Sequence, residues 1–338
     1  MRKRHFVVIG NGPAGHQAAL TLREHAPSAS VTVISREQGV PYKPHFLPKW
    51  VAGEVAEENL TLCPFDAYRE KGIELRCGQG VRAVDLSERR LVLEHREIVP
   101  FTGLIIAVGG RSRIPEPLLP FEDVLFTLKT TADAVIWKEA LPRVNSVLIL
   151  GGDLTSLAMT QALLTLGKKV HFMVDGEALW PLRSTPALLK EIGRKLSRRG
   201  VHVLPSGRLR SLARISDDRY EVRIEGKKLQ VGMVGAFFGL VPDIRFLAGS
   251  GLRIDRGILV DEYLNTGFAD VYATGDCAQV YHPAIRDYWV SVGYDNAVAL
   301  GRTAALNLAG GRNRAEAAKK NILEVQGIKV NTSWWMDF

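Results

Sequence analysis

A strand–turn–helix–strand pattern opens the chain and constrains its fold more than any other feature. An apolar run at 5–9 leads into Gly10-Asn11-Gly12-Pro13-Ala14-Gly15, followed by a helical pattern to Glu24 and a second apolar run at 31–34. Buried strands on either side of an amphipathic helix form a βαβ unit, and such units build a parallel sheet. The sequence therefore predicts a doubly wound α/β domain at this end of the chain.

The spacing of the glycines in this turn suits a dinucleotide. Gly10 permits the tight turn, Gly12 lets the backbone approach a pyrophosphate, and Gly15 lets the helix pack closely on the strand. The helix N-terminus, with Pro13 and Ala14 in its first turn, stabilises the anionic phosphates. A dinucleotide site is the interpretation that this pattern favours over a plain glycine turn.

The residues after the second strand leave one contact open. An acidic residue often stands there and binds the ribose of the dinucleotide. This chain has Ser35, followed by Arg36 and Glu37. We expect Ser35 and Arg36 to border the cofactor, without assigning the ribose contact.

A second copy of the unit lies further along the chain. A strand pattern at 146–150 is followed by Gly151-Gly152-Asp153, a helical pattern to Leu166 and another strand pattern at 170–174. A proline-rich linker at 114–120 separates the two units, since prolines there cannot continue a helix or a central strand.

A return crossover is expected near 238–242. The fold class is thus α/β, with two doubly wound, Rossmann-like dinucleotide-binding domains, the second inserted into the first. The predicted limits are 1–118 with 239–310 for the first domain, 119–238 for the second and 311–338 for a short C-terminal tail.

Composition limits the function classes. The chain has 338 residues, 44 Lys and Arg against 36 Asp and Glu, and a net charge of +8. A positive surface suits an acidic protein partner or an anionic cofactor, whereas the aromatic-basic motifs of nucleic-acid binders are missing from the sequence. The apolar runs are too short for a membrane span. The three cysteines show neither zinc spacing nor a disulfide framework, so we expect no metal site and a cytoplasmic protein.

Several motifs together resemble one family, the pyridine nucleotide-dependent FAD reductases. The resemblance is to the branch of rubredoxin reductases, ferredoxin reductases and the flavin domain of nitrite reductases. It rests on the first glycine turn and on the segments Pro41-Tyr42-Lys43-Pro44-His45-Phe46-Leu47-Pro48-Lys49, 102–110, 251–262 and Asp270-Val271-Tyr272-Ala273-Thr274-Gly275-Asp276. It covers roughly residues 5–310.

The resemblance implies an FAD site. Asp276 would accept a hydrogen bond from the ribityl chain, and Val81 would contact the adenine through its backbone. Lys49 would lie near the flavin ring as the candidate catalytic cation, and Lys43 could replace the positive charge lost where the branch has Arg at Pro44. The residues expected to bind FAD are Gly10, Gly12, Pro13, Ala14, Gly15, Ser35, Arg36, Lys43, Lys49, Val81, Ala107, Gly109 and Asp276.

The second turn departs from the family pattern. Asp153 replaces the second glycine, and we expect its charged side chain to oppose a pyrophosphate. Ser156 replaces the third glycine, and Ala158 stands where the family has Glu. Gly151, Gly152 and, on a ribose hydroxyl, Asp175 are the candidate NAD contacts. Asp175 without a neighbouring Arg favours NADH over NADPH, if either binds.

Two functions remain open at this point. The wider family contains disulfide reductases, but Cys63 lies beside Pro64 in a segment with a loop pattern and no C-x-x-C is present, so dithiol exchange is not expected. The leading hypothesis is an FAD-dependent oxidoreductase that passes electrons from NADH to an acidic redox carrier or a small acceptor. The alternative is an FAD-containing electron-transfer subunit or redox-responsive binding protein that does not use NAD(P)H. The aromatic side chains of the tail, Trp334, Trp335 and Phe338, would either dock back on the body of the protein or pack on another subunit in a homo- or hetero-oligomer.

Overall fold

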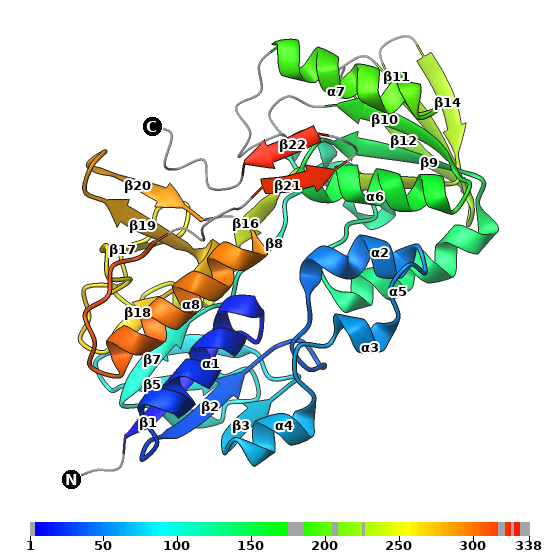
Figure 1. Ribbon diagram of the computed structural model, residues 1–338. Helices are drawn as coiled ribbons and strands as arrows, with labels where there is room; N and C mark the ends of the chain where they lie inside the picture. The colour runs from blue at the N-terminus through cyan, green and yellow to red at the C-terminus, as the bar shows by residue number, and fades with distance from the viewer. Residues whose placement is uncertain are drawn as a thin grey trace.

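The computed structural model describes residues 4–174, 186–204, 209–224, 227–291, 293–316, 322–325 and 328–331. For residues 186–188 and for those after 316 the description covers the backbone alone. Two parallel sheets, each covered on both faces, lie side by side and are joined by two crossings of the chain (Figure 1). The predicted fold class is confirmed.

The first sheet contains both ends of the opening βαβ unit. All four of its strand pairs are parallel. Its strand order is β18 (Val271–Ala273), β7 (Gly103–Ile106), β1 (His5–Ile9), β2 (Ser30–Ile34) and β3 (Ile73–Arg76). The strands are almost fully buried from Phe6 to Ile9 and from Val31 to Ile34, which explains their continuous apolar sequence.

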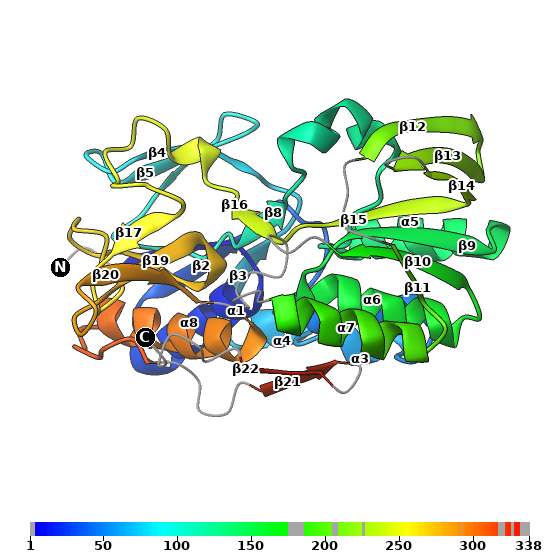
Figure 2. The same ribbon diagram turned by 90° about the horizontal axis from the view of Figure 1, so that it is seen from above.

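Different structures cover the two faces of this sheet. The helices α1 (Pro13–His25) and α8 (Tyr294–Leu308) pack against each other on one face. The antiparallel strands β4 (Val81–Asp85), β5 (Arg90–Leu93) and β6 (Ile98–Pro100) cover the opposite face, as Figure 2 shows. Apolar side chains of all these elements form one core cluster.

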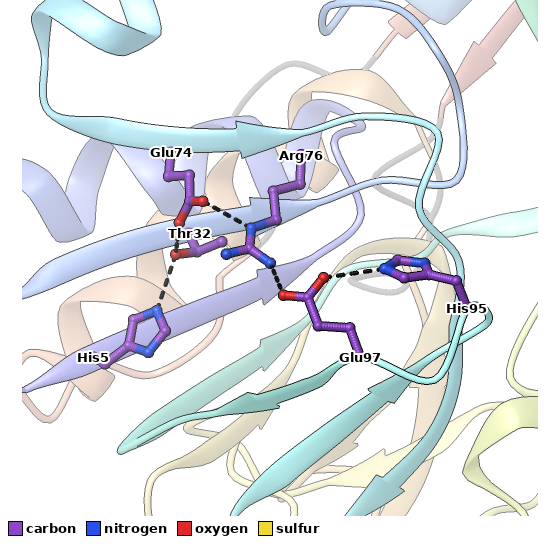
Figure 3. A network of polar contacts seen from close by, with 6 residues as sticks. All are labelled: His5, Thr32, Glu74, Arg76, His95 and Glu97. Carbon is purple, nitrogen blue, oxygen red and sulfur yellow. Dashed lines mark hydrogen bonds and ion pairs between the residues drawn. The ribbon is translucent and has the colours of Figure 1, made fainter.

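A chain of polar contacts fixes the start of this sheet to the small antiparallel sheet (Figure 3). It begins at Nε2 of His5, 2.9 Å from the Thr32 hydroxyl, which donates to Glu74. Arg76 then binds Glu74 at 2.8 Å and Glu97 at 2.7 Å. Because these contacts join β1, β2 and β3 to the β5–β6 turn, they hold the two layers in register.

The second sheet repeats the arrangement. Its order is β11 (His202–Leu204), β10 (Lys169–Val174), β9 (Ser146–Gly151) and β15 (Met233–Phe237), all parallel. Helices α5 (Thr131–Ala140), α6 (Leu154–Thr165) and α7 (Pro186–Arg198) belong to the core on one face. The antiparallel strands β12 (Leu209–Ser216), β13 (Arg219–Ile224) and β14 (Lys227–Val231) form the core on the other.

The two crossings between the sheets pair with each other. Strand β8 (Gly110–Ser112) leaves the first sheet and hydrogen-bonds antiparallel to β16 (Leu240–Pro242), which returns to it. The proline-rich linker at 114–120 follows β8 on the outgoing segment. It coils into 3-10 turns over Glu116–Val124, because the fixed φ of proline is compatible with helical turns, and Leu118 is buried there.

Short elements complete the fold. They are α2 (Leu47–Val51), α3 (Glu57–Leu60), α4 (Phe65–Glu70), the sheet of β17 (Ile258–Val260), β19 (Ala278–His282) and β20 (Asp287–Val290), and the hairpin β21 (Ile322–Val325) with β22 (Ile328–Asn331). The hairpin lies against α6 through β21 (Figure 1). Within the described part of the chain, every helix falls short of the length and hydrophobicity that a membrane crossing requires.

Candidate functional site

A cavity of about 940 Å³ opens where the strands of the first sheet end, bordered by the N-termini of α1, α6 and α8. The carboxyl ends of parallel strands are where doubly wound folds bind ligands. The structure brings most of the predicted FAD residues to this cavity: Gly10, Gly12, Pro13, Ala14, Ser35, Arg36, Val81, Ala107, Gly109 and Asp276 all line it.

The glycines of the first turn have separate roles. Gly10 has a φ of 103°, and a Cβ there would lie 2.3 Å from the Ala107 carbonyl oxygen. A Cβ on Gly15 would lie 1.9 Å from the Gly10 carbonyl oxygen, so Gly15 allows the close packing of helix on strand. A Cβ on Gly12 would meet nothing within 4 Å. Gly12 therefore keeps space free at the helix N-terminus.

This N-terminus is open to a ligand. Gly12 is the N-cap of α1 and supplies no capping side chain. Amide N–H groups at such a terminus attract anions, and together with the helix dipole they favour phosphate. The space at Gly12 and the uncapped helix fit the diphosphate of FAD.

Asn11, in the same turn, supports this interpretation and was not predicted from the sequence. It is 8% exposed, and its Nδ2 finds no hydrogen-bond partner among the described residues. Its Oδ1 accepts a hydrogen bond from the Tyr68 hydroxyl at 3.1 Å. A buried amide N–H without a partner is costly. Since Asn11 lines the cavity, FAD can supply the missing acceptor.

Asp276 follows β18 and lines the cavity close to the first turn, since a Cβ on its neighbour Gly275 would lie 3.1 Å from the Ala14 Cβ. Burial raises the pKa of its carboxyl, and the nearby Lys129 ammonium opposes that shift. Lys129 also lines the cavity. Lys129 was not predicted from the sequence, because its segment, just after the proline-rich linker, contains no binding motif.

The residues after β2, where the sequence left the ribose contact open, have different surroundings. The Arg36 guanidinium is engaged by Asp243 at 2.7 Å and by Glu94 at 3.6 Å. Glu37 lines the cavity and accepts a hydrogen bond from Tyr42 at 2.8 Å. Glu37 is thus the carboxylate nearest in sequence to the position of the usual ribose ligand, two residues beyond Ser35.

The two predicted lysines do not line the cavity. Lys49 is exposed, with its Nζ 5.6 Å from the centre of the Phe46 ring. Lys43 donates to the Asn59 carbonyl at 3.2 Å. The same segment instead presents His45, Leu47 and Pro48 to the cavity. A lysine ammonium is most stable in water, which favours this orientation; the flavin-proximal role of Lys49 stays a prediction.

His45 meets a residue from a distant part of the chain. Its ring packs against that of Tyr294, with centroids 4.6 Å apart, and both residues line the cavity. Tyr294 begins α8, so this contact closes one side of the cavity across the two segments.

At the second turn, two backbone N–H groups hold the carboxyl group of Asp153. Oδ1 accepts the Ser156 N–H at 2.8 Å and Oδ2 accepts the Gly239 N–H at 2.9 Å. The side chain turns back because these buried N–H groups need an acceptor. Gly151 keeps its turn role, with a φ of 115°, and Gly152 donates to the Phe237 carbonyl at 3.0 Å.

The second turn therefore does not fit a diphosphate in the way that the first one does. Ala158 borders the cavity, but Gly151 and Gly152 do not. Asp175, the predicted ribose ligand of this unit, lies outside the described residues.

Comparison with known proteins decides the family. The profile described as "Pyridine nucleotide-disulphide oxidoreductase" matches residues 4–304. The chain belongs to this oxidoreductase family. The oxidoreductase is 28% identical over 308 residues to rhodocoxin reductase of Rhodococcus erythropolis, covering 90% of this chain and 72% of that protein. It is 30% identical to the 5,5'-dehydrodivanillate O-demethylase ferredoxin reductase subunit of Sphingobium sp. (strain NBRC 103272 / SYK-6), over 81% of this chain and 68% of that one.

A solved structure shares the fold of the oxidoreductase. The crystal structure of the covalent putidaredoxin reductase–putidaredoxin complex matches with a TM-score of 0.87 and 23% identity, covering 96% of this chain and 80% of that chain. At this identity the match concerns the fold alone.

The three cysteines of the oxidoreductase form no disulfide. Cys63 and Cys277 are buried and Cys77 is partly buried, and all three are free thiols. Burial raises the pKa of the Cys277 thiol to about 11, so it stays protonated at neutral pH. None of the three borders the cavity as far as the chain is described.

Proposed function

We propose that the chain is an FAD-dependent oxidoreductase that passes electrons from NADH through the flavin to a protein acceptor, without a redox disulfide. The observation that carries this proposal is the cavity at the first turn. There an uncapped helix N-terminus, the unpartnered amide of Asn11 and the carboxylate of Asp276 border one space. Membership of the oxidoreductase family supports the same reaction class.

The residues of this site would bind and orient FAD. FAD, when bound, supplies the redox chemistry, because a flavin accepts two electrons together and can release them singly. The N–H groups after Gly12 hold the diphosphate, Asn11 donates its free N–H, and Asp276 accepts from the sugar-alcohol chain. The Lys129 ammonium favours the ionised form of the Asp276 carboxyl, because it opposes the rise in pKa that burial causes.

An acidic redox carrier is the proposed acceptor. Two relatives are named as reductases of a carrier protein, one for rhodocoxin and one for a ferredoxin. The net charge of +8 would speed encounter with a negatively charged carrier. With a small acidic [2Fe–2S] ferredoxin, we expect the second-order rate constant to fall as ionic strength rises, because salt screens the attraction.

Anaerobic stopped-flow mixing of the FAD-loaded protein with NADH tests the proposal. We expect the flavin absorbance to bleach, and to recover when the oxidised ferredoxin is added. Asp276→Ala should bleach only in proportion to the FAD it retains. A fully loaded protein whose flavin stays oxidised in excess NADH would contradict the proposal.

One observation favours the alternative, an FAD-containing electron-transfer subunit that does not use NAD(P)H. This observation is the capped second turn, where Asp153 takes up N–H groups that a nicotinamide dinucleotide would need. The stopped-flow experiment separates the two functions, because the alternative predicts reduction by a reduced carrier protein but not by NADH or NADPH.

Three further proposals follow from the sequence. The domain limits at 118/119 and 238/239 can be checked by limited proteolysis. Homo- or hetero-oligomers through the tail at 311–338 can be checked by sedimentation with and without that segment. The free thiols are compatible with a reducing cytoplasm, which cell fractionation would test.

A further inference from the structure

The two glycine turns of this chain form a matched pair. Gly12 and Asp153 are both helix N-caps with nearly the same backbone angles: φ −73° and ψ −176° for Gly12, φ −65° and ψ 173° for Asp153. The preceding glycines also agree, with φ of 103° at Gly10 and 115° at Gly151. Since the backbone is alike, the difference between the two turns lies in their side chains.

The first turn leaves its helix N-terminus empty, and the second fills it. No side chain caps α1 at Gly12, whereas the Asp153 carboxylate caps α6 by accepting the Ser156 N–H. Its other oxygen accepts the N–H of Gly239, 86 residues away, where the chain leaves the second sheet. A carboxylate in this position makes the same interactions that a bound phosphate would make with N–H groups and the helix dipole.

The second turn also differs from the first at Ser156, three residues after the capping residue Asp153. It occupies the position equivalent to Gly15, where a Cβ would lie 1.9 Å from the carbonyl oxygen of Gly10. Ser156 is nevertheless fully buried, and its hydroxyl donates to the Asp153 carbonyl. The second turn therefore accommodates a side chain at the position where the first turn has no room for one.

We propose that Asp153 is an internal anion that occupies the diphosphate position of the second dinucleotide-binding unit and thereby sets a low affinity for pyridine nucleotides. This inference deepens the proposed function, on which its relevance to NADH rests. It gives the expected opposition to a pyrophosphate a structural cause: the ligand competes with Asp153 for the same N–H groups. Asp153 is a specificity-determining residue in this sense and has no catalytic role.

Binding of NAD⁺ to the FAD-loaded protein, measured by isothermal titration calorimetry, tests the inference without any turnover. Asp153→Gly frees the N–H groups of Ser156 and Gly239 and restores the family's glycine. We expect it to lower the Kd for NAD⁺ by at least about tenfold relative to the natural chain. Asp153→Ser keeps a capping oxygen but removes the charge, and should lower the Kd by a smaller factor.

Asp217→Gly is the matched control for loss of one negative charge, since Asp217 is exposed and paired with Arg214 on the far side of the second unit. We expect its Kd to stay within twofold of the natural chain. If Asp153→Gly folds and its Kd also stays within about threefold, the inference is overturned. If Asp153→Gly does not fold, the same criterion applies to Asp153→Ser.

These outcomes are distinct from those of the proposed function. Tighter NAD⁺ binding by Asp153→Gly with a flavin that NADH never reduces would support the internal anion and contradict the proposed reaction. Rapid reduction of the natural protein by NADH, with no effect of the Asp153 variants on the Kd for NAD⁺, would support the proposed reaction and contradict the internal anion.

Discussion

The Nδ1 atom of His16 lies 2.6 Å from the hydroxyl of Tyr68 in the interior between α1 and α4. Tyr68 donates its single proton to Oδ1 of Asn11, so Nδ1 of His16 is the donor in its contact with Tyr68. Burial lowers the pKa of His16 to about 4, so the ring is neutral near pH 7. The Asn11 amide is thereby fixed with its Nδ2 free for a ligand. The buried hydrogen bonds from His16 through Tyr68 to Asn11 thus orient the Asn11 amide, which we assign to FAD binding.

Tyr68→Phe removes the hydroxyl that holds Asn11. We expect the Kd for FAD to rise severalfold and the free energy of unfolding to fall by about 1 kcal/mol, the usual contribution of one such hydrogen bond. Quenching of flavin fluorescence measures the Kd. Tyr281→Phe, the same chemical change on β19 outside the cavity lining, should leave it unchanged. Equal effects of the two variants would contradict the role of Tyr68.

Acid should destabilise the protein through His16. Burial lowers the pKa of His16 to about 4, from an ordinary value of 6.5. Between these two values the unfolded chain takes up a proton that the folded protein refuses, so stability falls as the pH falls through this window. The loss from His16 amounts to at most about 3 kcal/mol.

Urea unfolding between pH 7.5 and pH 4.5 measures this dependence. His16→Gln should show a shallower fall in the free energy of unfolding than the natural chain. His25→Gln is the control, since His25 lies on the same helix and is more exposed. Identical pH profiles for all three proteins would show that His16 does not carry the effect.

The glycines of the first turn should separate stability from cofactor binding. Gly12→Ala places a methyl in open space at an ordinary φ, so folding should be unaffected, while FAD binding should weaken at least about tenfold because the methyl fills the diphosphate space. Gly15→Ala must displace the Gly10 carbonyl and should cost about 1–3 kcal/mol of stability. Thermal unfolding and flavin titration distinguish the two, and a stable Gly15→Ala protein would contradict this geometry.

Lys129 should control the pH range over which FAD binds. Its ammonium lowers the pKa of Asp276, which burial raises. Lys129→Met removes the opposing effect, so the Asp276 pKa rises and FAD affinity should be lost at a higher pH during acidification. Flavin titration from pH 8 to pH 5 measures the midpoint. Lys228→Met, which removes an exposed lysine on β14 outside the cavity lining, should leave the midpoint in place.

Local patterns predicted the fold well. The strand pattern at 5–9 is β1, the helix expected to Glu24 ends at His25, and the second unit forms the parallel strands β9 and β10. Each of these features depends on apolar residues close together in the sequence. The orientation of Asp153 could not be predicted in this way, because its partner Gly239 is 86 residues distant. The same holds for Asn11, whose free amide becomes visible only when Tyr68 takes its oxygen.

The side chains of the lysines show the other limit of sequence reasoning. The family pattern around Lys49 predicts a residue at the flavin, and this stays a prediction. A motif does not specify a rotamer, and the Lys49 ammonium lies 5.6 Å from the centre of the Phe46 ring, outside the cavity lining. Lys129 illustrates the reverse case, since only the folded chain brings it near Asp276.

The pairing of β8 with β16 has a mechanical consequence. The outgoing and returning segments pair with each other, so they form one hinge between the two sheets instead of two separate linkers. The two domains therefore bend about this single hinge. A Cβ on Gly110 would lie 2.7 Å from the Val241 carbonyl oxygen. A side chain at Gly110 would therefore push β8 and β16 apart and change how widely the cofactor cavity can open.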